Sequence, residues 1–222
     1  MRTVVIGATG DVGRGVVRRA VARGWEVTAV SRDAARARAV FAGLAVTAVE
    51  ADLRDPVDAK RLAADVDAAH LDHLVVATNV PAPLRFVLNH DSRELVEHVA
   101  EILLTHHVAM RAFLPAMPVG SVFLGIGGGM ADHVVKGYAH ASIAQAAQRM
   151  LYRTVATEWL THPVVRELLV RSMVAGDTNR ETAPATWLTA DQVGERACQI
   201  LAAPEATDGP ILTLSPEGRA PS

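Results

Sequence analysis

The chain has 222 residues, of which 50% are hydrophobic and 21% are charged, and this suits one globular α/β domain spanning residues 1–222. Its formal net charge of −2 gives no reason to expect a nucleic acid or an anionic membrane as a partner. A single cysteine, Cys198, excludes an internal disulfide framework and indicates a reducing compartment such as the cytoplasm.

We expect neither a leader nor a membrane anchor. Arg2 is followed at once by an apolar run and a glycine loop, so we expect no signal peptide and a cytoplasmic location. No apolar run reaches the roughly 20 residues that a membrane helix needs. A small-molecule substrate is therefore the expected partner.

Short apolar runs alternate with longer amphipathic ones along the whole chain. The amphipathic patterns predict helices, and the apolar runs, which lack the alternation of a half-exposed strand, predict buried parallel strands. This order implies right-handed crossovers and a single Rossmann-type, doubly wound parallel α/β sheet of about seven strands with helices on both faces. The strands are expected at residues 3–7, 25–30, 45–51, 71–78, 121–126, 167–174 and 210–214, and the helices at 12–23, 33–42, 56–66, 92–114, 138–161 and 190–202.

Two loops are candidates for lids over a substrate. They are residues 81–83 and residues 176–186, which are rich in turn-forming residues. Loops that follow strands at their carboxyl ends commonly carry function in open α/β sheets.

A glycine loop lies between the first strand and the first helix. Gly7, Gly10 and Gly13 allow the backbone to turn sharply and to approach a pyrophosphate, which then contacts amides at the helix N-terminus. We expect Thr9 and Val12 to line the same dinucleotide site. Asp11 is an awkward neighbour for a phosphate and is expected to point outward, where it caps the helix or favours its dipole.

The end of the second strand predicts the choice of cofactor. An acidic residue about 20 positions after the glycines would hold the ribose hydroxyl of NAD(H), but Ser31 and Arg32 stand there. A hydroxyl and a guanidinium suit the 2′-phosphate of NADP(H). NADP(H) is therefore expected in preference to NAD(H).

With these features the chain resembles the short-chain dehydrogenase/reductase family along its whole length. "ADLRD" resembles the motif after the family's third strand, which implies that Asp52 and Leu53 flank the adenine. "LVVATN" stands in place of the family's "NNAG", which implies that Ala77, Thr78 and Asn79 lie beside the cofactor. The glycine spacing departs from that of the classical branch and is closer to the extended and atypical branches.

The family's catalysis implies an Asn, Ser, Tyr and Lys tetrad, of which only the tyrosine has a counterpart. Tyr138 stands where the general acid belongs. The lysine position, four residues on, holds Ser142, and the serine position after the fifth strand falls on Gly127 and Gly128. The asparagine should fall near Ile102, and residues 92–114 contain none.

Tyr138 therefore needs another activating group. A free tyrosine has a pKa of about 10, so acid–base chemistry near neutral pH requires a cation or a similar influence nearby. Candidates in the preceding loop are Lys136, which would have to fold back, and His133 or Asp132. His140 is a further candidate but lies on a different face of the helix, and Ser142, also a candidate site residue, carries no charge with which to lower the tyrosine pKa.

Other histidines and metal chemistry are less promising. His106 and His107 are expected to serve helix packing, with one ring able to face the pocket. No His, Cys or carboxylate cluster has metal-ligand spacing, so no metal is expected.

Three functions remain open. The favoured one is an NADP(H)-binding oxidoreductase with an atypical active site that acts on a small carbonyl or alcohol substrate. The alternatives are a non-redox enzyme on the same scaffold (an isomerase, dehydratase or cyclase) and a nucleotide-binding protein without catalysis. The resemblance also implies a homodimer or homotetramer formed by the helices at residues 92–114 and 138–161, with Leu95, Val99, Leu103 and Val108 as apolar contacts.

Overall fold

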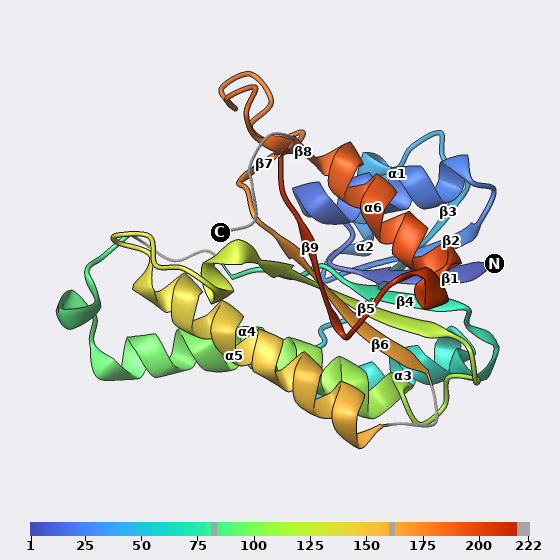
Figure 1. Ribbon diagram of the computed structural model, residues 1–222. Coiled ribbons are helices and arrows are strands. Elements are labelled where there is room, and N and C mark those ends of the chain that lie inside the picture. The colour runs from blue at the N-terminus through green and yellow to red at the C-terminus, as the bar shows by residue number, and fades with distance from the viewer. Residues whose placement is uncertain (81–83, 160–162, 217–222) are drawn as a thin grey trace.

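The computed structural model describes residues 1–80, 84–159 and 163–216, which form a three-layered α/β domain. A seven-stranded parallel sheet has the order β3-β2-β1-β4-β5-β6-β9 (Figure 1). The strand order reverses between β1 and β4, which makes this the doubly wound sheet that the alternating pattern predicts. The predicted fold class is confirmed.

The elements follow one another as strand and helix. The strands are β1 (Arg2–Ile6), β2 (Glu26–Ser31), β3 (Val46–Glu50), β4 (His73–Val76), β5 (Val122–Gly128), β6 (Val164–Val170) and β9 (Ile211–Leu214), with a separate pair of β7 (Val174–Ala175) and β8 (Leu188–Thr189). The helices are α1 (Asp11–Ala22), α2 (Ala34–Val40), α3 (Pro56–Asp65), α4 (Ser92–Phe113), α5 (Ala139–Glu158) and α6 (Ala190–Ala202). Single turns of 3₁₀ helix are η1 (Ala68–His70), η2 (Val87–Asn89), η3 (Gly129–Ala131) and η4 (Pro204–Ala206).

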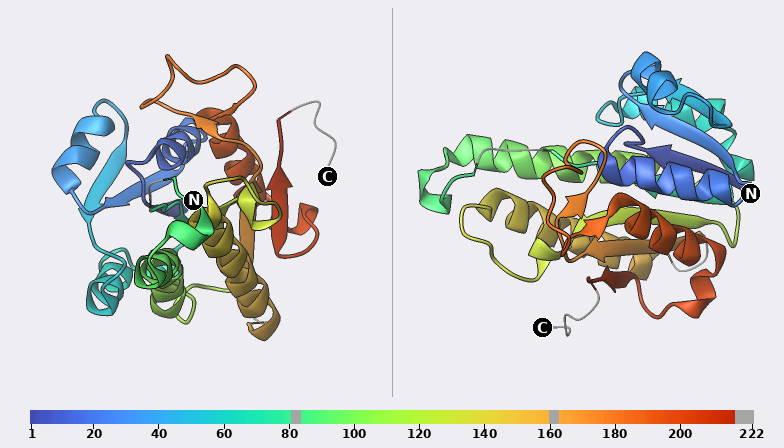
Figure 2. Two further views of the ribbon diagram at one scale, coloured as in Figure 1. Left: turned by 90° about the vertical axis from the view of Figure 1, so that its left-hand side faces the viewer. Right: turned by 90° about the horizontal axis from the view of Figure 1, so that it is seen from above.

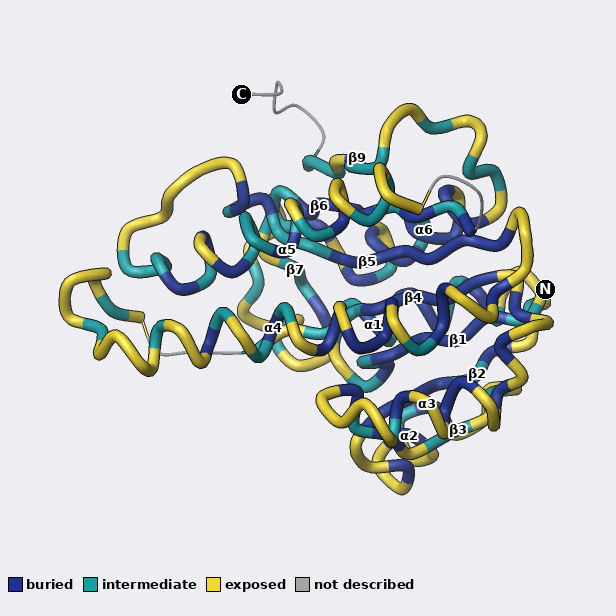
Figure 3. Tube along the Cα trace, turned by 90° about the horizontal axis from the view of Figure 1, so that it is seen from below, coloured by how far each residue is buried: buried dark blue, intermediate teal, exposed yellow. Residues whose placement is uncertain are grey.

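Helices cover both faces of the sheet. Helices α1, α2 and α6 lie on one face, and α3, α4 and α5 lie on the other (Figures 1 and 2). Each face has its own apolar cluster, with Val16, Val17 and Ile200 in one and Leu62 and Phe113 in the other. The central strands β1, β4, β5 and β6 are mostly buried on both faces, as their continuous apolar runs predict, whereas the edge strands β3 and β9 are partly exposed (Figure 3).

Helices α1 and α6 approach each other closely because glycines face each other between them. A Cβ atom on Gly15 would lie 2.0 Å from the carbonyl oxygen of Ala190, and one on Gly194 would lie 2.3 Å from the carbonyl oxygen of Gly15. Only a residue without a side chain fits at these two positions. Cys198 is buried beside this contact, and burial raises the pKa of its thiol to about 11.

The element boundaries differ from the prediction mainly at the sixth strand. The apolar run predicts a start at residue 167, but β6 begins at Val164, and the chain pairs again as β7 after a break of three residues. Arg166 interrupts the apolar run, which hides this start in the sequence. The predicted loop at residues 81–83 and the predicted end of the long helix at 161 lie outside the described residues.

Candidate functional site

The site lies where the carboxyl ends of three neighbouring strands meet. Ile6 at the end of β1 pairs with Val76 at the end of β4, and Val76 pairs in turn with Gly125 in β5. The loops that follow these strands therefore share one edge of the sheet. This is the edge at which open α/β sheets bind their ligands.

The glycine loop is a cradle that added side chains would fill. Gly7 has a positive φ of 77°, and a Cβ atom there would lie 2.5 Å from the carbonyl oxygen of Ala77. A Cβ atom on Gly13 would lie 2.2 Å from the carbonyl oxygen of Gly7. The loop is thus folded tightly on itself and against the end of β4, and it brings Gly7, Ala77 and Thr78 together as predicted.

Backbone amides at the start of α1 are available for an anion. The N-cap residue is Gly10, which makes no side-chain cap, so the amides of Asp11, Val12 and Gly13 have no intrahelical acceptor. The Arg14 guanidinium braces the loop from outside by donating to the carbonyl oxygen of Thr9 at 2.9 Å. Helix N-termini of this kind hold pyrophosphate in dinucleotide-binding folds, so the cradle fits NAD(P)(H).

Asp11 lies in the first turn of α1, where its negative charge favours the helix dipole as predicted. It does not cap α1, because its carboxylate accepts hydrogen bonds from the backbone amide and the hydroxyl of Thr178. Asp177 beside it forms ion pairs with Arg14 at 3.4 Å and with Arg18 at 2.9 Å. The predicted lid at residues 176–186 is therefore fastened to the glycine loop and the first turns of α1.

The predicted site for the 2′-phosphate combines an exposed and a buried residue. Arg32 is exposed at the carboxyl end of β2. Ser31 is buried, and its hydroxyl donates to the carbonyl oxygen of Asp33 at 2.6 Å, so it holds the turn that starts α2. The Glu50 carboxylate is also near, 3.4 Å from the backbone nitrogen of Ala34. Because Arg32 is exposed, its guanidinium is accessible to a ligand. The Ser31 hydroxyl instead stabilises the turn before α2.

The predicted adenine residues lie at the end of β3. Leu53 is buried in the core, whereas Asp52 is half-buried. The Arg54 guanidinium binds the Asp52 carboxylate at 2.6 Å and holds the pKa of that carboxyl below its ordinary value, with a smaller contribution from Arg32. Asp52 is therefore an anion at the mouth of the site.

The segment after β4 connects the site with the interior. Asn79 is exposed and Thr78 is half-buried, with the Thr78 hydroxyl 3.4 Å from Nε2 of His106. On its other side, Nδ1 of His106 lies 2.8 Å from the hydroxyl of Tyr152. His106 is fully buried, and burial lowers its pKa to about 3, so the ring is neutral. His106 was expected mainly to serve helix packing, and Tyr152 was not predicted as a site residue.

Tyr138 stands at the N-terminal end of α5, as predicted, and is half-buried. Its ring is stacked on that of His140 with centroids 6.3 Å apart. His140 also contacts His98 at 4.9 Å and His90 at 5.5 Å between centroids. Burial, and then the neighbouring imidazoles of His98 and His90, lower the pKa of His140, so a neutral His140 ring is favoured beside Tyr138.

The four candidate residues around Tyr138 lie in four different environments. Ser142 is buried, and its hydroxyl has no hydrogen-bond partner among the described residues. The Lys136 ammonium lies over the ring of Phe86, 5.2 Å from its centroid. His133 is exposed, and Asp132 is paired with Arg149 and Arg171, which fasten the loop to α5 and β6.

The glycines of strand β5 are explained by polar groups packed against them. A Cβ atom on Gly125 would lie 2.0 Å from the Tyr152 hydroxyl, and one on Gly127 would lie 2.5 Å from Oε1 of Glu167. Gln148 donates to that same Oε1 at 2.8 Å and to the carbonyl oxygen of Ile126 at 3.1 Å. Buried polar side chains therefore occupy the space beside these two glycines.

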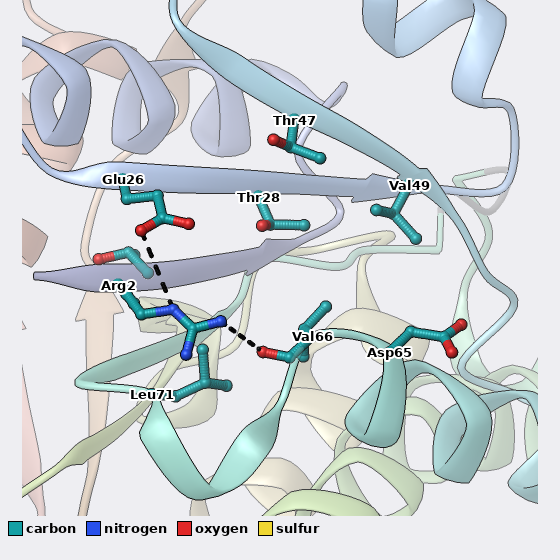
Figure 4. Close-up of a pocket in the computed structure, with 9 residues that line it drawn as sticks. Arg2, Glu26, Thr28, Thr47, Val49, Asp65, Val66 and Leu71 are labelled. Atoms are coloured by element: carbon teal, nitrogen blue, oxygen red, sulfur yellow. Dashed lines mark hydrogen bonds and ion pairs between the residues drawn. The ribbon is translucent and has the colours of Figure 1, made fainter.

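A shallow pocket of about 190 Å³ lies elsewhere, at the amino ends of β1 and β2 (Figure 4). Arg2 projects into it, with an ion pair to Glu26 at 3.9 Å and a hydrogen bond to the carbonyl oxygen of Val66 at 3.2 Å. The cofactor loops lie at the opposite ends of these strands. We therefore assign this pocket no part in the site.

Within residues 1–80, 84–159 and 163–216, no three His, Cys, Asp or Glu side chains are grouped so that they could hold a metal ion. No helix in the same ranges is long and apolar enough to span a membrane.

Comparison with known proteins gave one family match. The NAD(P)H-binding family matches residues 7–161, which is more than half of the chain and includes the glycine loop and Tyr138. No curated protein matches the sequence.

Solved structures share the fold at low sequence identity. The NADPH-bound short chain oxidoreductase from Pseudomonas aeruginosa PAO1, which contains an atypical catalytic center, is 19% identical over 100% of this chain and 97% of its own, with a TM-score of 0.85. The alcohol dehydrogenase from Thermococcus sibiricus complexed with 5-hydroxy-NADP is 18% identical over 100% and 99% of the two chains, with a TM-score of 0.82. Serine dehydrogenase from Escherichia coli is 19% identical over 99% and 100%, with a TM-score of 0.81.

Proposed function

Because this chain belongs to the NAD(P)H-binding family and has the fold of the short-chain oxidoreductases, we propose that it is an NADP(H)-dependent oxidoreductase that acts on a small carbonyl or alcohol. The observation that carries the proposal is the glycine cradle beneath unpartnered helix amides at the carboxyl ends of β1 and β4. Two proteins with this fold bind NADPH and 5-hydroxy-NADP, which supports the choice of cofactor.

Different residues would bind different parts of the cofactor. The amides of residues 11–13 would bind the pyrophosphate, and Arg32 would bind the 2′-phosphate through paired hydrogen bonds. Asp52 and Leu53 would flank the adenine, and Ala77, Thr78 and Asn79 would line the nicotinamide half. The His106 contact limits the orientations of the Thr78 hydroxyl at that end.

Tyr138 is the proposed proton donor. NADPH would supply a hydride to the carbonyl carbon of the substrate. The electron pair of the C=O π bond would then move to the oxygen, and Tyr138 would donate its proton to that oxygen. Tyr138 then recovers a proton from water, which its half-exposed position allows. The imidazole of His140 is stacked on the Tyr138 ring, and its pKa is lowered, so it supplies no positive charge beside the Tyr138 hydroxyl.

A non-redox reaction is the second candidate, and one observation favours it. The residue one turn after Tyr138 is Ser142, and the ammonium of Lys136 lies over Phe86. A tyrosine without a cation is a poor acid near neutral pH. An isomerisation or dehydration in which a histidine transfers the proton would not depend on the acidity of Tyr138.

The variant Gly10→Ala tests the cofactor site without disturbing the fold. Gly10 has an extended backbone with φ of −72°, and a Cβ atom there would have only an ordinary contact, 3.5 Å from the carbonyl oxygen of Gly7. The added methyl group would instead face the pyrophosphate. We expect an unchanged melting temperature and at least a roughly tenfold weaker affinity for NADPH, measured by fluorescence titration. Equal NADPH affinity in the variant and the wild type would contradict the proposed site.

A further inference from the structure

Polar side chains form a column on the face of α5 that meets strand β5. Tyr138, Ser142 and Gln145 are spaced four and three residues apart, which places them on one side of the helix. Farther along the same helix, Gln148 and Tyr152 already have buried partners. By contrast, the Ser142 hydroxyl and Oε1 of Gln145 are buried without a hydrogen-bond partner among the described residues.

Gln145 fills the side-chain position of Gly128. A Cβ atom on Gly128 would lie 2.3 Å from Oε1 of Gln145 and 2.5 Å from both Cδ and Nε2. The backbone of Gly128 is extended, with φ of −115° and ψ of 152°, so any residue could adopt it. A side chain at position 128 would therefore have to displace the Gln145 carboxamide, whereas the backbone conformation would accept any residue.

This position is the one at which the family's catalytic hydroxyl is missing. Gly128 is the last residue of β5, at the edge of the sheet where Thr78 and Tyr138 also lie. The exchange of a serine for a glycine would leave the substrate oxygen without its hydrogen bond. A carboxamide from α5 now stands in the same place, with polar atoms that the protein leaves unused.

The half-buried Gln145 side chain has a buried Oε1 that is available to a ligand. A buried polar atom without a partner costs free energy, so most such atoms in proteins are hydrogen-bonded. A half-turn of the Gln145 side-chain amide exchanges its oxygen and nitrogen without a change in volume, so it can present either a donor or an acceptor. The nitrogen can therefore donate to a carbonyl oxygen.

We propose that the Gln145 carboxamide donates a hydrogen bond to the substrate oxygen, in place of the missing hydroxyl. The inference rests on the proposed oxidoreductase function and adds a residue to it. Gln145 orients the oxygen and stabilises the negative charge that develops on it, while Tyr138 delivers the proton. Gly128 and Gln145 form one unit, because neither side chain can enlarge without displacing the other.

The variant Gln145→Leu tests this assignment, since leucine keeps most of the volume and removes both polar atoms. Gln199→Leu, on the exposed face of α6, is the matched control. With a carbonyl substrate of the wild type, we expect kcat to fall about a hundredfold in Gln145→Leu, the usual loss when one donor to a developing oxyanion is removed. The dissociation constant of NADPH in Gln145→Leu should stay within about twofold of the wild-type value, because the proposed hydrogen bond of Gln145 is made to the substrate and not to the cofactor. A Gln145→Leu variant that keeps more than half of the wild-type kcat would overturn the assignment.

A second pair of variants separates the hydrogen bond from the packing. Gly128→Ser alone should unfold at lower temperature, because its Cβ atom would overlap the carboxamide. In the Gly128→Ser and Gln145→Ala double variant the space is free and a hydroxyl is restored, so we expect both the stability and most of the activity to return. If the double variant recovers its stability but its kcat stays as low as that of Gln145→Leu, the hydroxyl at position 128 does not contact the substrate oxygen.

The assignment can also be tested without turnover. Isobutyramide, an unreactive analogue of an aldehyde, is titrated into the NADPH-saturated protein, and Gln145→Leu is expected to weaken its binding at least tenfold. Equal binding by variant and wild type, or no binding by the wild type, would overturn the role of Gln145. A wild type that binds isobutyramide through Gln145 but reduces no carbonyl compound would contradict the oxidoreductase function instead.

Discussion

The pH dependence of stability should be governed on its alkaline side by Glu167. This carboxylate is fully buried in β6, and burial raises its pKa from the ordinary 4.5 to about 8, against the smaller opposing effects of Gln148 and Arg149. The folded protein therefore binds this proton more tightly than the unfolded chain does. Stability from this group is fully present below pH 4.5 and is lost as the pH rises through about 8.

The loss is large compared with the stability of an ordinary domain. One unit of pKa shift corresponds to about 1.4 kcal/mol, so the contribution of Glu167 to the free energy of unfolding should fall by roughly 3 to 4 kcal/mol between pH 5 and pH 8. Domains of this kind are stable by about 5 to 15 kcal/mol. Buried histidines act in the opposite direction, since burial lowers the pKa of His73 to about 4 and that of His106 to about 3. Their contribution is lost as the pH falls below about 6.5.

The variant Glu167→Gln isolates the carboxylate from the histidines. Glutamine keeps the oxygen that accepts from Gln148 and cannot ionise, so the histidine contribution cancels when the variant is compared with the wild type. Urea unfolding at several pH values should show that the variant gains roughly 3 to 4 kcal/mol relative to the wild type between pH 5 and pH 8. Glu158→Gln, at the exposed end of α5, is the control and should run parallel to the wild type. A stability difference between Glu167→Gln and the wild type that does not change with pH would refute the reasoning.

Three further predictions follow from the cofactor site, the proton donor and the helix surfaces. Arg32→Ala should weaken NADPH binding at least tenfold and leave NADH binding unchanged, as measured by fluorescence, and equal affinities of the wild type for the two cofactors would exclude the assignment. Tyr138→Phe should lower the rate about a hundred- to ten-thousand-fold with NADPH binding intact, and a loss below about tenfold would mean that another group, with His133 next in line, moves the proton. Light scattering at micromolar concentration should show a dimer or tetramer, because Leu104 on α4 and Met150 on α5 are 41% and 55% exposed, and the monomer mass of 23.6 kDa would contradict this.

The fold could be predicted from the sequence because it depends on local patterns. Apolar runs predict the seven strands of the sheet, and the spacing of Gly7, Gly10 and Gly13 predicts the loop that joins β1 to α1. Val108 shows the limit of such patterns. The apolar stripe on its helix was predicted to serve an oligomer interface, but Val108 is buried in the core of its own chain.

The interior of the site could not be predicted, since it depends on residues far apart in the sequence. The run of glycines from Gly125 predicts missing side chains, but not which groups take their space. Tyr152 lies 27 positions after Gly125, and Glu167 lies 40 positions after Gly127. A glutamate within an otherwise apolar strand is a signal that a buried polar network is near. Asp11 shows the same limit, because its partner Thr178 comes from the other end of the chain.

Hydride transfer is the central claim, and isotope transfer tests it most directly. NADPH carrying deuterium at C4 of the nicotinamide, prepared separately with the label on each face, would be incubated with the protein and a panel of small aldehydes and ketones. We predict that one of the two labelled forms gives an alcohol with deuterium on the carbon of the former carbonyl group, detected by mass spectrometry, and that the other form gives an unlabelled alcohol. Tight NADPH binding with no deuterium in any product from either form would contradict the account.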